Sequence, residues 1–170
     1  MSGFLSAHGY DPGPTQRPLT SGAVSGVLAT GPAIAVLHLF GSLAVEARML
    51  GLSVAATIVV GTLVMALAGA FYARLLGRAA NDVWGGWLFG MAYGFILWAA
   101  GAVFVLPLVG NRQLPAGPPA TGLLLSLILW GGFLGAFLPF VHRRLQLSLE
   151  KAGTAERLEP SLAAQISLIR

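Results

Sequence analysis

The chain has 170 residues, of which 56% are hydrophobic and only 9% are charged, and its mean hydropathy is +0.79. This composition excludes a soluble globular protein and a disordered chain, and it predicts an integral membrane protein. The net charge is +4, but the basic residues are spread among apolar segments without forming a basic stripe, so we expect no nucleic-acid partner. The absence of cysteine excludes disulfides and thiolate-bound metals.

Residues 1–18 are polar and rich in glycine and proline, and we expect them to form an extended cytoplasmic tail. The first predicted span covers residues 19–45. Pro32 lies near its middle; because proline has no backbone N–H, it is expected to kink the helix and to leave the carbonyl of Leu28 without its helical partner. A smooth face for close packing is predicted where small residues recur one turn apart, at Gly22 and Gly26.

A short turn at Glu46 and Arg48 joins the first span to the second, which covers residues 49–76. The two spans are therefore expected to form an antiparallel hairpin. The packing face of the second span is predicted from small residues at four-residue steps: Thr62, Ala66 and Ala70.

The third predicted span, residues 83–109, has twenty-seven residues without a charge, and this length and apolarity are typical of a membrane-spanning helix. Trp84 and Trp87 lie near its start and are expected to anchor it at the level of the lipid headgroups. Glycines that recur every four residues line one face, which another helix can approach closely. These glycines are Gly86, Gly90 and Gly94.

The fourth predicted span covers residues 120–141 and follows a proline-rich linker at residues 110–119. It ends at a basic cluster that includes Arg143 and Arg144. The same four-residue glycine step recurs in it, at Gly131 and Gly135.

Residues 145–170 are predicted to form a cytoplasmic helical tail. We expect this helix to stop at Gly153 and a short amphipathic helix to begin at Pro160, because apolar residues recur there at helical spacing. Such a helix would lie on the bilayer or on a partner.

The basic residues predict the orientation. If both termini face the cytoplasm, eight Lys and Arg residues lie on that side, and only Arg48 and Arg112 lie on the other. Positive charge accumulates on the cytoplasmic side of membrane proteins. We therefore expect a multi-pass protein of the bacterial inner membrane with both termini in the cytoplasm.

Three residues inside the spans are candidates for contact with a cofactor. His38 is predicted to lie well inside the first span, where a neutral imidazole can ligate haem or (bacterio)chlorophyll. Trp98 and Trp130 lie near the middle of their spans and could flank a flat lipid-soluble ligand such as a quinone or carotenoid. The competing interpretation is structural, with each ring nitrogen hydrogen-bonded within the helix bundle.

Two groups of charged residues mark the ends of the spans. Arg143, Arg144 and Lys151 could bind anionic lipid headgroups, although a cluster that only sets topology would look the same. Glu46 and Arg48 could coordinate a ligand at the opposite surface, or they could form a solvated turn.

The spans lack the groups that membrane-embedded chemistry needs. All six Asp and Glu residues lie in tails or turns, whereas ion and proton carriers place ionisable residues within their spans. A buried nucleophile beside a base, or a pair of metal-binding histidines, is also missing from the pattern. We therefore predict that the protein is not an enzyme and holds no metal.

Three glycine-rich segments, residues 21–41 (SGAVSGVLATGPAIAVLHLFG), 84–98 (WGGWLFGMAYGFILW) and 130–140 (WGGFLGAFLPF), together resemble an uncharacterised family of small bacterial four-helix integral membrane proteins, a domain of unknown function. The resemblance covers residues 19–144. It implies a four-helix bundle, brings no established catalytic residue, and suggests an association with bacterial electron-transport machinery.

The sequence thus predicts an all-α membrane protein, a bundle of four transmembrane helices with a short C-terminal amphipathic helix. The leading functional hypothesis is a non-catalytic accessory subunit of a larger respiratory or photosynthetic membrane complex, whose glycine faces pack on the helices of other transmembrane subunits and whose edge holds lipid or quinone. The alternatives are a small pore or transporter for a neutral or lipid-soluble solute, and a pigment- or haem-binding subunit that uses His38.

Overall fold

The computed structural model describes residues 18–77, 83–109 and 116–168. These residues are almost entirely helical and contain no strand. Within them, four segments are long and apolar enough to cross a membrane: Leu19–Leu39, Val54–Leu76, Gly85–Leu108 and Pro118–Leu145. This is the architecture of a multi-pass membrane protein.

The first two predicted spans have wrong boundaries, because two glycines end helices there. Helix α2 (Pro18–Leu39) stops six residues before the predicted end, and a separate short helix α3 (Ser42–Leu50) follows it. Gly41 (φ 68°) and Gly51 (φ 65°) flank α3 in the left-handed conformation, which glycine adopts without steric cost and which ends an α-helix. The predicted 19–45 span is therefore two elements.

Helix α4 (Val54–Leu76) begins five residues later than the predicted start of the second span. Its first turn is capped by Ser53, whose side chain accepts a hydrogen bond from the backbone N–H of Ala56 at 3.1 Å. A serine at this position pairs a donor that the helix itself leaves unpaired. Hydropathy does not reveal this boundary, because the residues just before Ser53 are also apolar.

The third predicted span agrees in its limits with three consecutive elements, α5 (Val83–Leu97), η1 (Trp98–Val105) and α6 (Leu106–Val109). Element η1 is a π-helix, in which each turn is wider; the backbone N–H of Leu106 accordingly donates to the carbonyl of Gly101, five residues earlier. Element η1 ends at Val105, two residues before Pro107. Because proline has no backbone N–H, Pro107 can donate neither an α-helical nor a π-helical hydrogen bond.

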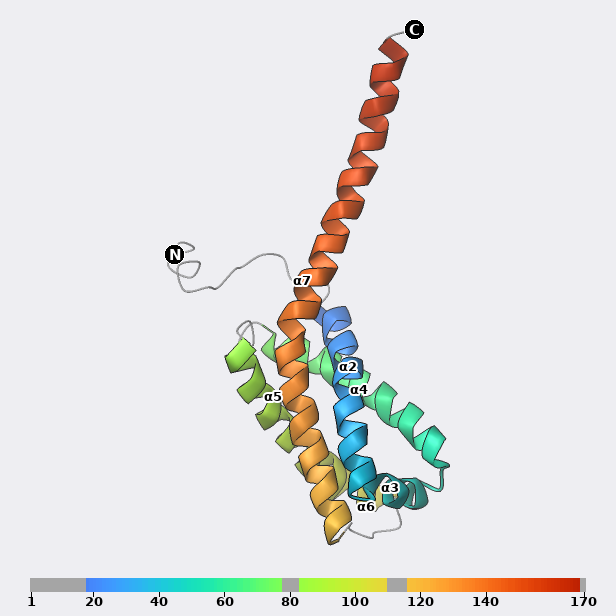
Figure 1. The fold of residues 1–170 in the computed structure, drawn as a ribbon, viewed down its shortest axis with the longest axis vertical. Helices are drawn as coiled ribbons and strands as arrows, with labels where there is room; N and C mark the ends of the chain where they lie inside the picture. The colour runs from blue at the N-terminus through green and yellow to red at the C-terminus, as the bar shows by residue number, and fades with distance from the viewer. Residues whose placement is uncertain (1–17, 78–82, 110–115, 169–170) are drawn as a thin grey trace.

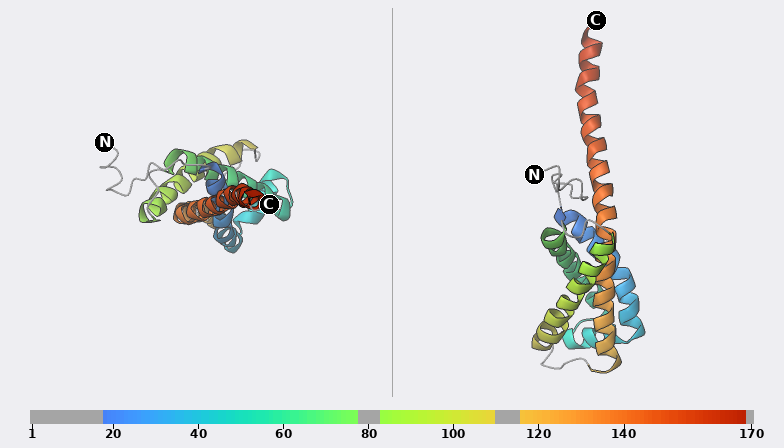
Figure 2. Two further views of the ribbon diagram at one scale, coloured as in Figure 1. Left: turned by 90° about the horizontal axis from the view of Figure 1, so that it is seen from above. Right: turned by 90° about the vertical axis from the view of Figure 1, so that its left-hand side faces the viewer.

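Helix α7 (Pro118–Leu168) contains the fourth predicted span and then continues far beyond it. The predicted stop at Gly153 and the separate helix from Pro160 are wrong. One glycine costs a helix only about 1 kcal/mol, and most neighbouring residues here are strong helix formers. Figures 1 and 2 show this extension standing clear of the other helices, so solvent can reach the carbonyl that Pro160 leaves without a donor.

The helices pack in the order α4, α2, α7, α5, and the contact between α4 and α5 is narrow. In Figure 1, α2 begins and α7 leaves the helical domain at the same end, and α3 lies at the opposite end. There the buried Ser42 of α3 donates a hydrogen bond from Oγ to the carbonyl of Pro119, at 2.8 Å. This bond ties α3 to the start of α7.

The predicted packing glycines lie at two helix crossings. On α5 and α7, a Cβ added to Gly90 would overlap the carbonyl of Gly131, and one added to Gly94 would overlap that of Leu127. The relation is reciprocal, because a Cβ on Gly131 would overlap the Gly90 carbonyl. In the same way, a Cβ added to Gly135 would overlap the carbonyl of Gly86.

The second crossing joins α2 to α4. Gly22 and Gly26 approach α4 so closely that an added Cβ on either would meet a backbone carbonyl. Their nearest α4 neighbours are Met65, Gly69 and Ala73, rather than the predicted face of Thr62, Ala66 and Ala70. Gly69 occupies the crossing point because a glycine permits the shortest distance between helix axes.

We predict that Gly90→Ala lowers the free energy of unfolding by about 1–3 kcal/mol, because the new methyl group must push α5 away from α7. The measurement is unfolding by sodium dodecyl sulfate in mixed micelles, followed by tryptophan fluorescence. Gly61→Ala is the matched control, since nothing lies within 4 Å of a Cβ at that position on α4. Equal stability of the two variants would contradict the glycine crossing of α5 and α7.

Candidate functional site

Three aromatic side chains with polar tips meet between the helices: Tyr72 of α4, Tyr93 of α5 and Trp130 of α7. We call them the aromatic core. Trp130 and Tyr72 are fully buried and Tyr93 nearly so. The ring centroids of Tyr72 and Tyr93 are 5.3 Å apart, and those of Tyr93 and Trp130 are 6.3 Å apart.

Each polar tip of the aromatic core donates a hydrogen bond to a backbone carbonyl of a different helix. The Tyr72 hydroxyl donates to Gly86 at 3.1 Å, and the Tyr93 hydroxyl donates to Ala68 at 2.9 Å. These two bonds cross between α4 and α5 in opposite directions. A third links α7 to α2, as the Trp130 indole Nε1–H donates to the carbonyl of Gly26 at 2.9 Å.

The aromatic core favours the structural interpretation of Trp130 over ligand binding. Its indole donor is already bonded inside the protein, and the ring is packed among α2, α5 and α7 with no exposed surface. The Gly26 carbonyl also accepts a hydrogen bond from the Thr30 hydroxyl at 2.8 Å. Polar groups in hydrocarbon are paired in this way because an unpaired group costs several kcal/mol.

Tyr72 and Tyr93 were missed by the sequence analysis, although a signal for them exists. A tyrosine in the middle of an apolar span carries a hydroxyl that needs a hydrogen-bond partner, and both tyrosines lie inside predicted spans. Which carbonyl would accept each bond depends on how the helices cross, and the sequence does not contain that information in a readable form.

Trp98 lies apart from the aromatic core. It is the first residue of η1, is half-buried, and packs its ring on Phe95 with the centroids 5.6 Å apart. The structure therefore does not bring Trp98 and Trp130 together around one flat ligand.

His38 lies at the edge of a span rather than well inside it. Because α2 ends at Leu39, His38 belongs to the last turn, and its side chain is exposed. Its backbone carbonyl accepts a hydrogen bond from the N–H of Gly41 at 3.1 Å. Among the described residues, no group of three or more His, Cys, Asp and Glu side chains is placed to hold a metal ion.

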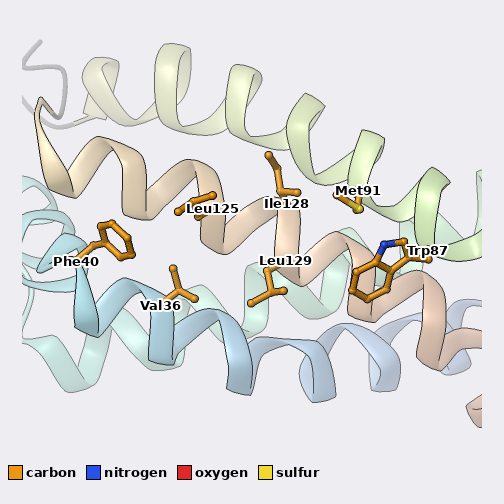
Figure 3. A pocket seen from close by; sticks show the side chains of 7 residues that line it. All are labelled: Val36, Phe40, Trp87, Met91, Leu125, Ile128 and Leu129. Carbon is orange, nitrogen blue, oxygen red and sulfur yellow. The ribbon is translucent and has the colours of Figure 1, made fainter.

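An apolar groove of about 300 Å³ runs along the outer side of α7, between α2 and α5 (Figure 3). Figure 3 shows the side chains of Phe40 and Trp87 at its two ends, with those of α7 between them. His38, Trp98 and Trp130 do not line it. Its walls are Val36 and Phe40 of α2, Trp87 and Met91 of α5, and Leu125, Ile128 and Leu129 of α7.

The charged candidates lie at opposite ends of the helical domain. Arg143 and Arg144 are exposed on α7 near the end where α2 begins; Lys151 belongs to the same helix, but its side chain lies outside the described part of the structure. At the other end, on α3, Arg48 donates a hydrogen bond to the carbonyl of Ala44 at 3.2 Å. Burial raises the pKa of Glu46, two residues before Arg48 on α3, to about 7 from its usual value of 4.5.

No protein-family model, curated protein or solved structure matches this chain.

We predict that Trp130→Phe lowers the free energy of unfolding in micelles by about 1–3 kcal/mol, since it removes the hydrogen bond to Gly26 and leaves empty volume in the core. Trp98→Phe makes the same chemical change outside the aromatic core and is expected to cost clearly less. Tyr72→Phe keeps the ring and isolates one hydrogen bond, so its expected cost is about 0.6–1.7 kcal/mol. A larger loss in Trp98→Phe than in Trp130→Phe would contradict this assignment.

We also predict that Glu46 makes the protein less stable as the pH rises. A carboxyl whose pKa is higher in the folded than in the unfolded chain stabilises the fold below the unfolded pKa, and this contribution is lost as the pH rises through the folded pKa. Stability should therefore fall between about pH 4.5 and pH 7 and stay level above. Unfolding of Glu46→Gln, compared with the unaltered chain at pH 5 and pH 8, isolates this contribution; an unchanged difference would exclude Glu46 as its source.

Proposed function

We propose that the protein is a non-catalytic accessory subunit of a larger energy-converting complex in the bacterial inner membrane. The observation that carries this proposal is the uninterrupted course of α7 out of the helical domain. From Leu145 to Leu168 the helix advances by about 35 Å at 1.5 Å per residue.

A lone helix of this length needs support. Isolated helices in water are marginal, and most helical stability in proteins comes from packing an apolar face. The extension of α7 stands clear of the other helices in all three views (Figures 1 and 2). A partner subunit that rises from the membrane surface would supply the missing surface.

The place of the partner contact differs from the one expected from the sequence. The glycine faces were expected to receive helices of other subunits, but the α2–α4 and α5–α7 crossings use them within this chain. In the membrane, the broadest remaining surface belongs to α4, since only 11% of its span is buried. Its large exposed apolar side chains are Val54, Val59, Val60, Leu63, Val64, Leu67, Phe71 and Leu75.

The orientation and the type of host complex rest on sequence features. Arg74, Arg143 and Arg144 lie near the end from which α7 extends, which supports a cytoplasmic position for that end and for both termini. The respiratory or photosynthetic character of the host rests on the family resemblance of residues 19–144 alone.

The two alternative functions have less support. A pore would pass between the helices, where Trp130, Tyr72 and Leu134 fill the space. The Leu28 side chain, one turn before Pro32, is on the exposed surface of α2 rather than toward the interior. A pigment or haem on His38 would be held at the exposed end of α2, outside the groove.

Extraction of the native membrane in mild detergent, followed by a native gel and mass spectrometry, tests the accessory role. The protein is expected to migrate with a complex much larger than itself. Ala155→Pro should reduce the co-purified partner, because a proline inside the extension costs the helix about 3 kcal/mol, whereas Ala155→Ser should not. Migration of the full chain as a lone monomer would reject the proposal.

A further inference from the structure

We propose that α3 is a pH-sensitive element of the fold. It stays docked on α2, α4 and α7 while Glu46 is protonated, and it detaches by rotation about Gly41 and Gly51 when Glu46 ionises. Its release uncovers the start of α7, at the end of the helical domain opposite the α7 extension (Figure 1). This inference concerns the conformation of the chain itself and does not depend on the accessory role.

Glu46 lies in the middle of the face with which α3 packs on the other helices. The buried residues of α3 are Ser42, Leu43 and Ala47. Since one helical turn takes about 3.6 residues, the angular position of Glu46 falls between those of Ser42 and Leu43. The exposed residues of α3, Ala44 and Arg48, lie on the opposite side. The carboxyl of Glu46 therefore leaves the helix on its packed side.

Among the described residues, the carboxyl of Glu46 has no ion pair and no hydrogen bond. Helix α2 contributes His38, whose side chain is exposed in the last turn. On α3 itself, Arg48 donates to the carbonyl of Ala44. Element α6 has no titratable residue. The titratable residues of α4 and α7 whose side chains the structure describes lie toward the opposite end: Tyr72, Arg74, His142, Arg143 and Arg144.

The position of Glu46 makes docking of α3 depend on pH. A carboxylate without a partner is costly to keep on a packed face, and burial raises the pKa of Glu46 to about 7 from its usual value of 4.5. A carboxyl whose pKa is higher in the docked than in the released state favours docking below the released pKa, and this contribution is lost as the pH rises through the docked pKa. Docking is therefore favoured below about pH 4.5 and loses this contribution by about pH 7.

The connections of α3 allow it to move as a unit. Gly41 and Gly51 flank it in the left-handed conformation, and nothing lies within 4 Å of a Cβ at either position, so the backbone can rotate there without meeting a neighbour. The polar contact that holds α3 is the hydrogen bond from Ser42 to the carbonyl of Pro119. Ser42 also covers Gly122 of α7, where an added Cβ would meet its Oγ. A helix of nine residues held in this way is an element that opens locally.

Because the chain has no cysteine, single cysteines can report the release of α3. The full chain in mild detergent micelles is labelled with a maleimide at pH 5.5 and at pH 8. Ala47→Cys places the thiol on the buried face of α3, and Ala44→Cys places it on the exposed side; the ratio of their labelling rates removes the pH dependence of thiol chemistry. We expect this ratio to rise about tenfold or more from pH 5.5 to pH 8, since a pKa difference of one corresponds to a factor of ten.

Two variants separate local release from other effects. Glu46→Gln removes the titrating group at nearly constant size, and in that background the ratio should be the same at both pH values. Ala33→Cys places a thiol at a buried position of α2 and should be labelled slowly at both. The proposal is overturned if the ratio does not rise, if it rises equally in Glu46→Gln, or if Ala33→Cys is labelled in parallel, because the whole helical domain would then be unfolding.

Hydrogen exchange of the unaltered chain gives the same comparison without a cysteine. After correction for the intrinsic exchange rate, the amides of α3 should lose about tenfold or more of their protection from pH 5.5 to pH 8, whereas those at the centre of α2 should keep theirs. Unchanged protection of α3 would equally overturn the proposal.

Discussion

The fold depends on close contact between helix backbones at glycine. Where α5 crosses α7 and α2 crosses α4, carbonyl groups stand in the space that a side chain would otherwise occupy. The same proximity brings helix carbonyls within reach of aromatic donors on other helices, and two of the three bonds of the aromatic core end on glycine carbonyls, those of Gly26 and Gly86. Close packing and the pairing of buried polar groups therefore have one structural cause.

In the described part of the structure the interior is closely packed, and one buried side-chain atom there, Ser25 Oγ, has no hydrogen-bond partner. The aromatic core fills the space between the helices and uses its donors internally, while α4, the groove beside α7 and the extension of α7 remain uncovered. Exposed apolar surfaces of this kind are typical of contacts with lipids and with other proteins.

Much of the secondary structure could be predicted, and the errors have specific causes. The limits of the third span were predicted because uncharged length is a strong signal. The predicted end of the first span and the predicted start of the second are wrong because Gly41 and Gly51 end helices there. Both glycines lie in a largely apolar run, so hydropathy does not change at these positions. The predicted end of the last helix is wrong because Gly153 and Pro160 do not stop α7, in which most neighbouring residues are strong helix formers. Of the candidate site residues, Trp130 belongs to the interior, whereas His38 was displaced to a helix end by the early stop of α2.

The sequence by itself determined that the chain is helical, that it has segments long and apolar enough to span a membrane, and that glycines recur at the spacing of helix packing, because composition and local periodicity are properties of the chain alone. Only the tertiary structure decided which glycine faces which helix, which carbonyls receive Tyr72, Tyr93 and Trp130, and that Gly69 rather than Ala66 lies at the crossing. These pairings depend on the crossing positions of helices far apart in the chain, and many alternative crossings satisfy the same local pattern.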